Sequence, residues 1–113
     1  MITILPDGRD AFVLSDGDMA VLRCRYSCGE KEAELLELEE LETFSDPGSV
    51  LHCAVVRAVL SKLVFAGVTK VLCRSGNPVM CRTLDLLKTE RTDGEYRIDT
   101  VEFFARKCDG CGN

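Results

Sequence analysis

Residues 46–73, DPGSVLHCAVVRAVLSKLVFAGVTKVLC, decide the fold of this chain. Apolar side chains recur there every four residues, as on one face of a helix: Leu51, Val55, Val59 and Leu63. The pair Asp46-Pro47 supplies a helix cap and a proline in the first turn, and Gly67 stands where a glycine releases the chain. The apolar residues 68–73 follow and are typical of a short buried strand. This stretch therefore predicts a long helix that leads into a strand.

The same start signal occurs again at Asn77-Pro78. Val79, Met80, Thr83, Leu84 and Leu87 follow at helical spacing and predict a second helix that ends near Glu90. After a turn at 92–94, residues 96–107 have the composition of a strand and lead into a cysteine-containing tail, 108–113.

The first 30 residues favour strands and tight turns. Apolar runs at 2–5, 11–14 and 19–26 are separated by Pro6-Asp7-Gly8 and by Asp16-Gly17. Asp-Gly between apolar runs is a strong hairpin signal, because glycine accepts a positive φ without steric cost. The N-terminal segment is therefore predicted to be an antiparallel β-meander.

Residues 31–44 leave two interpretations open. Their Ala, Leu, Glu and Lys residues all favour a helix. Leu36, Leu38 and Phe44 nevertheless fall on one face at a period of two, which favours a strand.

Composition limits the possible functions. The chain has 113 residues, which predicts a single domain, and no apolar run approaches the length of a membrane span. The net charge is −5 and the basic residues are scattered, so neither nucleic acid nor a membrane is expected as a partner. The N-terminus lacks the pattern of an export signal, which predicts a cytoplasmic protein. Oligomeric state is left open.

From residue 33 to 104, the order of elements is strand, glycine-containing loop, long helix, strand, Asn-Pro, helix, antiparallel strand. This order resembles the C-terminal half of a GNAT acetyltransferase. The resemblance implies an α/β (α+β) fold with a mixed, mostly antiparallel sheet and two helices, and it favours a strand at 31–44. The N-terminal β-meander would cover 1–30, the GNAT-like core 31–107 and the tail 108–113.

The resemblance also implies acetyl-CoA as the cofactor. A strand at 33–43 would lie along the pantetheine arm, with Leu41 and Thr43 close to it. The phosphate loop would contain Gly48, Ser49 and Val50 at the start of the long helix, where free amides and the helix dipole favour an anion. Asn77 matches an asparagine that touches the pantetheine in these enzymes.

Several catalytic parts of the family depart from its pattern here. The phosphate loop lacks its basic residue and carries Asp46, residues 78–89 contain no tyrosine to protonate the CoA thiolate, and residues 1–30 do not match the two N-terminal helices. Glu40 and Glu42 are the candidates for a general base. The resemblance thus implies either a reduced acetyltransferase that acts on a small-molecule or protein amine, or a relative that has lost catalysis.

Seven cysteines call for an explanation. Cys24-x3-Cys28 and Cys108-x2-Cys111 are each followed by glycine and resemble metal knuckles, so together they predict a structural zinc site. The expected sheet would bring both pairs to the same edge. Ordinary thiols are the alternative. His52, the single histidine, is expected on a helix surface rather than at a metal.

Seven glutamates in residues 30–42 form an acidic segment. A solvated face explains such a run, and a surface that attracts a basic protein partner is the alternative. The second hypothesis for function is therefore a non-enzymatic interaction module, stapled by zinc, whose acidic segment engages a partner.

Overall fold

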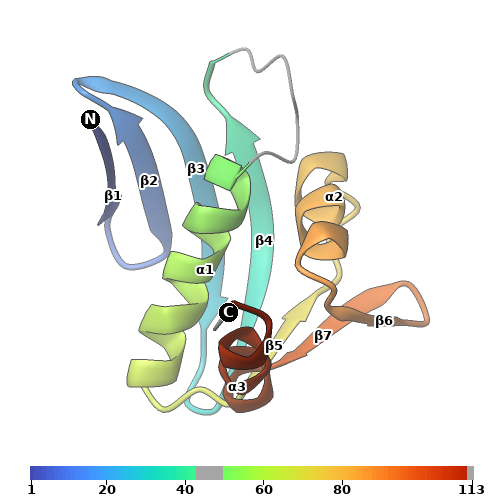
Figure 1. Ribbon diagram of the computed structural model, residues 1–113. Helices are drawn as coiled ribbons and strands as arrows, with labels where there is room; N and C mark the ends of the chain where they lie inside the picture. Colours follow the sequence, from blue (N-terminus) through green and yellow to red (C-terminus); the bar gives the residue numbers. More distant parts are fainter. Residues whose placement is uncertain (43–49, 112–113) are drawn as a thin grey trace.

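The computed structural model describes residues 1–42 and 50–111, with side chains described as far as Ala105. Strands and helices alternate from residue 32 to residue 86, and a β-hairpin and a third helix follow (Figure 1). The elements are β1 (Ile2–Pro6), β2 (Ala11–Asp16), β3 (Met19–Cys28), β4 (Glu32–Glu40), α1 (Val50–Phe65), β5 (Lys70–Cys73), α2 (Pro78–Leu86), β6 (Glu90–Thr92), β7 (Glu95–Asp99) and α3 (Thr100–Cys111).

The strands form one seven-stranded sheet in the order β1-β2-β3-β4-β5-β7-β6. Only β4 and β5 are parallel, and every other neighbouring pair is antiparallel. The crossover between β4 and β5 is made by α1. The mixed, mostly antiparallel sheet that the sequence predicted is therefore confirmed.

The N-terminal meander is also as predicted. β1, β2 and β3 pair antiparallel in sequence order, and Gly17 has a φ of +65° in the Asp-Gly turn between β2 and β3. Phe12, Leu14 and Leu22 turn into the core, whereas Leu5 is 62% exposed on the edge strand.

For residues 31–44, the amino-acid composition favoured a helix and the period-two pattern of apolar residues favoured a strand. The structure has the strand β4 over most of these residues. β4 pairs with β3 along nearly its whole length. Ala33, Leu35 and Leu38 are buried, and the glutamates between them point to the other face. Packing of this apolar face overrides the helix propensity of Glu and Leu.

Both predicted helices are present. In α1 the side chains Val55, Val56, Val59 and Leu60 are fully buried, and Gly67 follows with a φ of +89°. At α2 the Asn77 side chain caps the helix by accepting from the Met80 N–H at 2.8 Å. The Asp46 cap of α1 lies outside the described residues.

The predicted final strand is wrong beyond Asp99. Residues 100–111 form a third helix, α3, where a strand over 96–107 and a tail were expected. The Asp99 carboxylate accepts a hydrogen bond from the Glu102 N–H at 2.9 Å, and the buried Thr100 hydroxyl donates to the Val68 carbonyl. Asp99 and Glu102 have the spacing of a capping box, so the β-branched and aromatic residues around them were a misleading signal.

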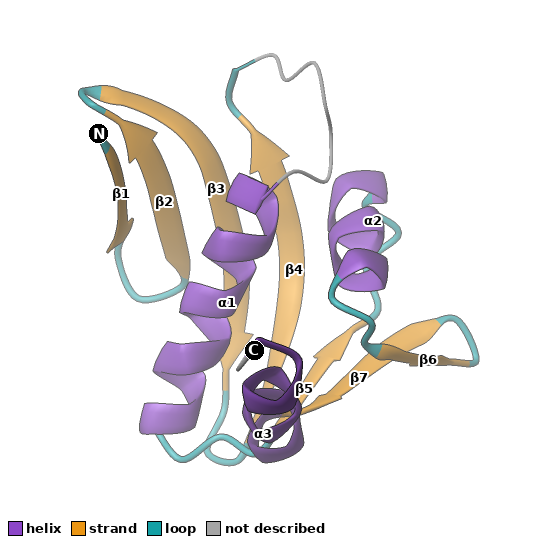
Figure 2. Ribbon diagram, viewed as in Figure 1, coloured by secondary structure: helices purple, strands orange, loops and turns teal. Residues whose placement is uncertain are grey.

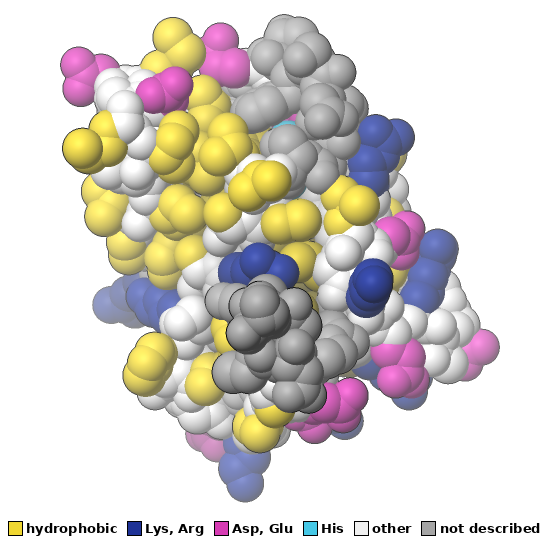
Figure 3. Space-filling model, viewed as in Figure 1, with side chains coloured by type: hydrophobic (Ala, Val, Ile, Leu, Met, Phe, Trp, Pro, Cys, Tyr) yellow, Lys and Arg dark blue, Asp and Glu magenta, His cyan; other side chains and the backbone are white. Residues whose placement is uncertain are grey.

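The two faces of the sheet differ in character. All three helices cover one face, called here the helix face (Figures 1 and 2), and the opposite outer face carries no helix of the described chain. Viewed from the helix side, hydrophobic side chains gather over the N-terminal strands and α1 (Figure 3). No helix among the described residues is long and apolar enough to span a bilayer.

Cross-strand ion pairs cover the outer face. Four glutamates of β4 each lie near a cation of a neighbouring strand or, for Arg74, of the residue directly after β5: Glu32 near Lys70, Glu34 near Arg74, Glu37 near Arg25 and Glu39 near Arg23. Alternation along β4 places these side chains on the face away from the helices. Most of the acidic segment is therefore paired within the sheet, which favours a solvated face over a surface that attracts a basic partner.

Leu60→Ala tests the position of the core. Leu60 is fully buried in α1, so its truncation should leave a cavity and lower the free energy of unfolding by about 2–5 kcal/mol. Leu86→Ala, at a side chain 52% exposed on α2, is the control and should change it by less than about 1 kcal/mol. Equal effects in urea denaturation would contradict this core.

Candidate functional site

The separation of β4 from β5 is the main feature of the candidate site. The two strands pair at only three positions, Glu32 with Lys70, Ala33 with Val71 and Glu34 with Leu72. From Leu35 to Glu40, β4 continues to pair with β3 but forms no pair with β5 in the described chain. One backbone edge of β4 is therefore left open over about six residues.

A β-bulge marks the point of separation. Leu35 lies opposite Tyr26 and Glu37 lies opposite Arg25, so Leu36 is an extra residue in β4. A bulge bends its strand and increases the local twist. This bend carries the C-terminal half of β4, residues 36–40 (the upper half in Figure 1), away from β5. It also places Leu38 and Glu40 on the helix face.

A small hollow lies on the helix face beside the open edge. It is lined by Glu40 from the end of β4 and by Pro78, Val79 and Arg82 from α2, with a volume of about 170 Å³. α2 packs against both β4 and α1 here, beside the upper half of β4 (Figure 1). The hollow therefore holds an anionic and a cationic group beside an unpaired strand edge.

Glu40, a predicted base, bonds to His52. The Glu40 carboxylate accepts a hydrogen bond from His52 Nε2 at 2.8 Å, joining the end of β4 to the first turn of α1. The His52 side chain is fully buried, so the expectation that it lies on the helix surface is wrong. Burial follows from its position three and four residues before Val55 and Val56, on the buried face of α1. Glu40 itself keeps 26% of its side chain exposed.

The other predicted site residues lie in different environments. Glu42 is exposed in the bend after β4. Leu41 donates its N–H to the Val21 carbonyl at 2.9 Å, so this amide is already used within the sheet. Val50 is the first residue of α1 and is 82% exposed. Thr43, Gly48 and Ser49 lie outside the described residues.

Asn77 has a structural task at the start of α2. Its side-chain oxygen caps the helix through the Met80 N–H, and its own N–H donates to the Ser75 hydroxyl at 3.0 Å. The amide oxygen is thus used by the helix, and the amide nitrogen is the group of this side chain that remains for a ligand.

Tyr96 lies beneath α2, in place of a tyrosine on that helix. Its hydroxyl donates to an Asp85 carboxylate oxygen at 2.8 Å. Burial, with the hydrogen bond to Asp85, raises the pKa of Tyr96 to about 12. The Tyr96 hydroxyl is therefore a weak acid whose proton is held by Asp85.

A second hollow lies on the outer face, at the point where β4 and β5 separate. Arg74 donates there from Nε and Nη2 to the two Glu34 carboxylate oxygens at 3.2 and 2.9 Å. This fork holds the pKa of Glu34 below its usual value. The hollow has a volume of about 150 Å³ and is lined by Ser27, Glu32, Ala33, Glu34, Leu72 and Arg74.

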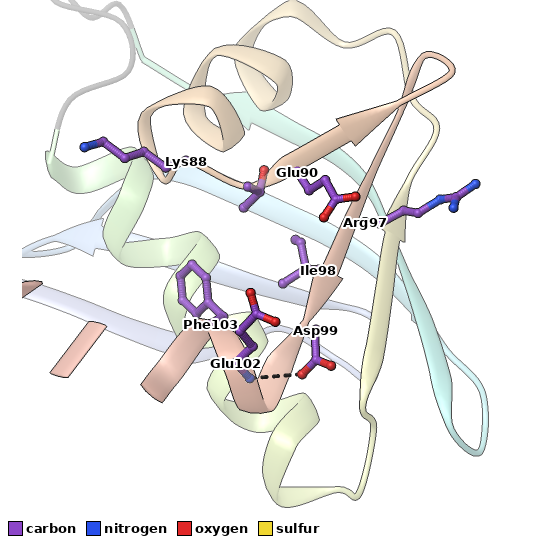
Figure 4. A pocket seen from close by; sticks show the side chains of 8 residues that line it. Lys88, Glu90, Arg97, Ile98, Asp99, Glu102 and Phe103 are labelled. Carbon is purple, nitrogen blue, oxygen red and sulfur yellow. Dashed lines mark hydrogen bonds between the residues drawn. The ribbon is translucent and has the colours of Figure 1, made fainter. Parts of the chain in front are cut away.

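A third hollow lies between the end of α2, the β6–β7 hairpin and α3 (Figure 4). Lys88, Glu90 and Glu102 give it mixed charge, and Phe103 contributes an apolar wall. Its Asp99 carboxylate already caps α3 (Figure 4). None of the catalytic, cofactor-binding or metal-binding residues predicted from the sequence lines this hollow.

The predicted zinc knuckle at Cys24 and Cys28 is not present. Both residues lie in the extended strand β3, four positions or about 13 Å apart, which is too far to share one ion. Cys24 is buried, and desolvation raises the pKa of its thiol to about 12, whereas Cys28 is exposed. Among described side chains, no group of three or more His, Cys, Asp or Glu is arranged to hold a metal ion.

The other half of the predicted zinc site is only partly described. Cys108 and Cys111 lie in α3, and their side chains are outside the described ones. α3 follows β7, and β4 and β5 separate β7 from β3 in the sheet. The register places the end of β3 and the end of β7 at the same end of the sheet, and whether the two pairs meet there stays a prediction.

Comparisons with known proteins bear on the fold. No protein-family model and no curated sequence matches the chain. Ard1 from Thermoplasma volcanium is similar in structure, with a TM-score of 0.57, 18% identity and coverage of 78% of this chain and 67% of Ard1. A mutant AtaT toxin bound to the C-terminus of the antitoxin AtaR has a TM-score of 0.60, 14% identity and coverage of 91% and 93%.

The same toxin with AtaR and acetyl-CoA gives a TM-score of 0.59 at 14% identity, with coverage of 91% of this chain and 94% of the toxin. Ard1 is an N-acetyltransferase and AtaT a GNAT toxin. The chain therefore has a GNAT-like fold, as its element order predicted.

A double-mutant cycle tests the bond between Glu40 and His52. His52→Asn and Glu40→Gln should each lower the free energy of unfolding, by about 1–3 kcal/mol, because each leaves a partly buried polar partner unpaired. The double variant should lose less than the sum of the two, since the bond can be broken only once. Additive losses would show that the two side chains do not interact.

Thiol titration tests the placement of the cysteines. With a disulfide reagent on the folded protein, Cys28→Ser should remove one rapidly reacting thiol, because Cys28 is exposed. Cys24→Ala should leave the rapid count unchanged, since the Cys24 thiol is buried with a pKa of about 12. A Cys28 thiol that reacts only after a chelator is added would contradict this assignment and support a metal.

Proposed function

We propose that this chain binds acetyl-CoA along the open edge of β4 and transfers the acetyl group to an amine. The separation of β4 from β5 after Glu34 and Leu72 carries the proposal. An unpaired strand edge offers backbone amides and carbonyls that an amide-containing chain can pair with, as an added strand would. The pantetheine arm of CoA is such a chain. Acetyl-CoA bound to the structurally similar AtaT toxin supports this choice of cofactor.

The start of α1 fixes the direction in which the cofactor would lie. Free amides at a helix N-terminus favour phosphate, and the first turn of α1 contains no acidic residue. The phosphates would therefore lie near Val50, and the loop with Gly48 and Ser49 would complete their site. Pantetheine would run down β4 from there, and the thioester would reach the point where β4 and β5 separate.

Arg82 and Asn77 extend this site from α2. Arg82 is exposed at the hollow beside Glu40, within reach of a negatively charged ligand at the top of β4. The amide nitrogen of Asn77 would donate to a carbonyl of the arm. The Glu40 carboxylate, whose negative charge opposes phosphate, is held by His52 in a hydrogen bond.

The reaction itself requires a neutral amine. Its nitrogen attacks the thioester carbonyl, a C–N bond forms, the C–S bond breaks, and the nitrogen loses a proton as the CoA thiolate gains one. The Tyr96 proton is held by Asp85, so the thiolate would take its proton from the attacking nitrogen through water. With no dedicated acid among the described side chains, such a site would be a slow catalyst.

Glu40 then has a positioning role in this proposal. It lies five positions after Leu35, about 13–17 Å along the strand with the bulge at Leu36, so it lies at the phosphate end of the arm. Its bond to His52 ties the end of β4 to α1. Glu42 is exposed still further along the chain.

Calorimetry with acetyl-CoA and Arg82→Glu tests the cofactor site. The wild-type chain should bind acetyl-CoA, and the charge reversal should weaken binding about tenfold, because a cation beside the phosphates becomes an anion. Arg9→Glu changes charge equally at an exposed residue between β1 and β2, and should leave affinity within about twofold.

Two outcomes would count against the proposal. Absence of binding by the wild-type chain at millimolar acetyl-CoA would remove the cofactor altogether. Equal loss in Arg82→Glu and Arg9→Glu would mean that only net charge matters and that the ligand does not lie between β4 and α2.

A further inference from the structure

We propose that the edge strand β1 pairs with β1 of a second copy of this chain, which joins two seven-stranded sheets into one. Among the described residues, β1 has a neighbouring strand on one side only, β2 (Figure 1). An edge strand presents a row of unpaired N–H and C=O groups that another strand can bind. Two strands separate β1 from β4, so this pairing does not depend on the proposed cofactor site.

The two edges of the sheet differ in their protection against such pairing. β6, at the far edge, has three residues, Glu90–Thr92, of which two are charged. Short and charged edge strands resist pairing with another chain. β1 has five residues, Ile-Thr-Ile-Leu-Pro, with no charged side chain, and none of the five is buried. Ile2 is 43% and Leu5 62% exposed, so a single copy leaves these apolar side chains largely outside its core.

Hydrogen bonds between β1 and β2 identify the backbone groups of β1 that point outward. At one end of the pair, the Gly17 N–H donates to the Met1 carbonyl at 2.9 Å. At the other end, the Asp7 N–H donates to the Ala11 carbonyl at 2.8 Å. Bonding alternates along an antiparallel pair, so the odd-numbered residues of β1 bond to β2. The even-numbered residues therefore point their backbone groups away from the sheet: Ile2, Ile4 and Pro6.

These outward groups match those of a second β1 that runs antiparallel. When the whole strand Ile2–Pro6 pairs with its copy, Ile4 lies opposite Ile4 of the second copy, on a twofold axis. The two Ile4 residues then exchange both hydrogen bonds, and each Ile2 N–H donates to the Pro6 carbonyl of the other copy. Pro6 has no N–H to leave unpaired. Every outward N–H of β1 therefore finds an acceptor in this register.

The side chains of β1 fit the same register. Ile4 lies opposite Leu14 of β2, which is fully buried, so Ile4 is on the helix face. Across the axis, Ile4 would contact its own counterpart, and on the outer face Thr3 would lie opposite Leu5 of the other copy. Cross-strand pairs of β-branched side chains stabilise a sheet. The pairing would therefore cover apolar side chains on both faces.

Charge does not oppose the contact, and the assembly closes at two copies. Residues 2–6 are uncharged, so no like charges would face each other across the axis. Asp7, the first charged residue after β1, is already paired with Arg23 at 3.3 Å. In the joined sheet the outermost strands are the two β6 strands, which are short and charged. A closed dimer is therefore expected rather than a chain of copies.

Sedimentation equilibrium over a range of protein concentrations tests this pairing. The wild-type chain should approach twice the mass of one copy as its concentration rises. Ile4→Pro should raise the dissociation constant of the dimer at least about tenfold, because it removes an intermolecular donor from both copies and leaves the bonds to β2 intact. Ile4→Lys should do the same by placing two like charges on the axis. Met19→Lys, at a side chain of β3 that is 54% exposed, is the control and should change the constant by less than about twofold.

Amide hydrogen exchange tests the register. In the dimer, the amides of Ile2 and Ile4 should exchange at least about tenfold more slowly than in the dilute monomer, whereas those of Thr3 and Leu5, which bond to β2, should change less. A wild-type chain that stays monomeric at millimolar concentration would overturn the inference. So would a dimer in which Ile2 and Ile4 exchange as fast as in the monomer, or one that both Ile4 variants leave unchanged.

Discussion

The parting of β4 from β5 is the constraint on which the candidate site depends. Two parallel strands that pair at three positions and then diverge leave backbone groups open on one edge, and polar backbone needs a partner. The extra residue Leu36 bends β4 at that point, while continuous pairing with β3 keeps the strand in the sheet. α2, capped by Asn77, packs against the same half of β4. An open edge, a bend and a helix thus meet at one place.

The period-two alternation of β4 organises the rest of the sheet around this edge. Leu35 and Leu38 are buried in the core on the helix face, and Glu37 and Glu39 pair with arginines on the outer face. Without the bulge, a single alternation could not put both Leu35 and Leu38 into the core, because they are three residues apart. The bulge therefore serves packing as well as the edge, and each cross-strand ion pair is a surface pair of small individual energy.

Much of this fold could be predicted from the sequence, because its signals are local. The signals for the N-terminal hairpins, α1 and α2 each depend on neighbouring residues. They are the Asp-Gly turns, the four-residue spacing in α1 and the Asn-Pro start of α2, and the elements that they predict are present. α3 was missed because Tyr96, Ile98 and Val101 have strand propensity, whereas the Asp99 cap with Glu102 at the third helical position was the decisive signal. Cys24 and Cys28 resembled a knuckle only by spacing, and an extended backbone separates them.

The candidate site was harder to predict, because its contacts join residues that sequence spacing does not connect. Glu40 was a candidate among seven glutamates, and its distinguishing property is the bond to His52, twelve residues later on another element. Alternation alone, counted from Ala33, would have put Glu40 on the outer face with Glu34; the bulge at Leu36 reverses this and turns Glu40 toward α1. Glu32 and Glu34 precede the bulge, so simple alternation leaves them on the outer face beside Arg74. One extra residue in β4 therefore decides which glutamate of the strand joins the helix face and which glutamates stay on the outer face.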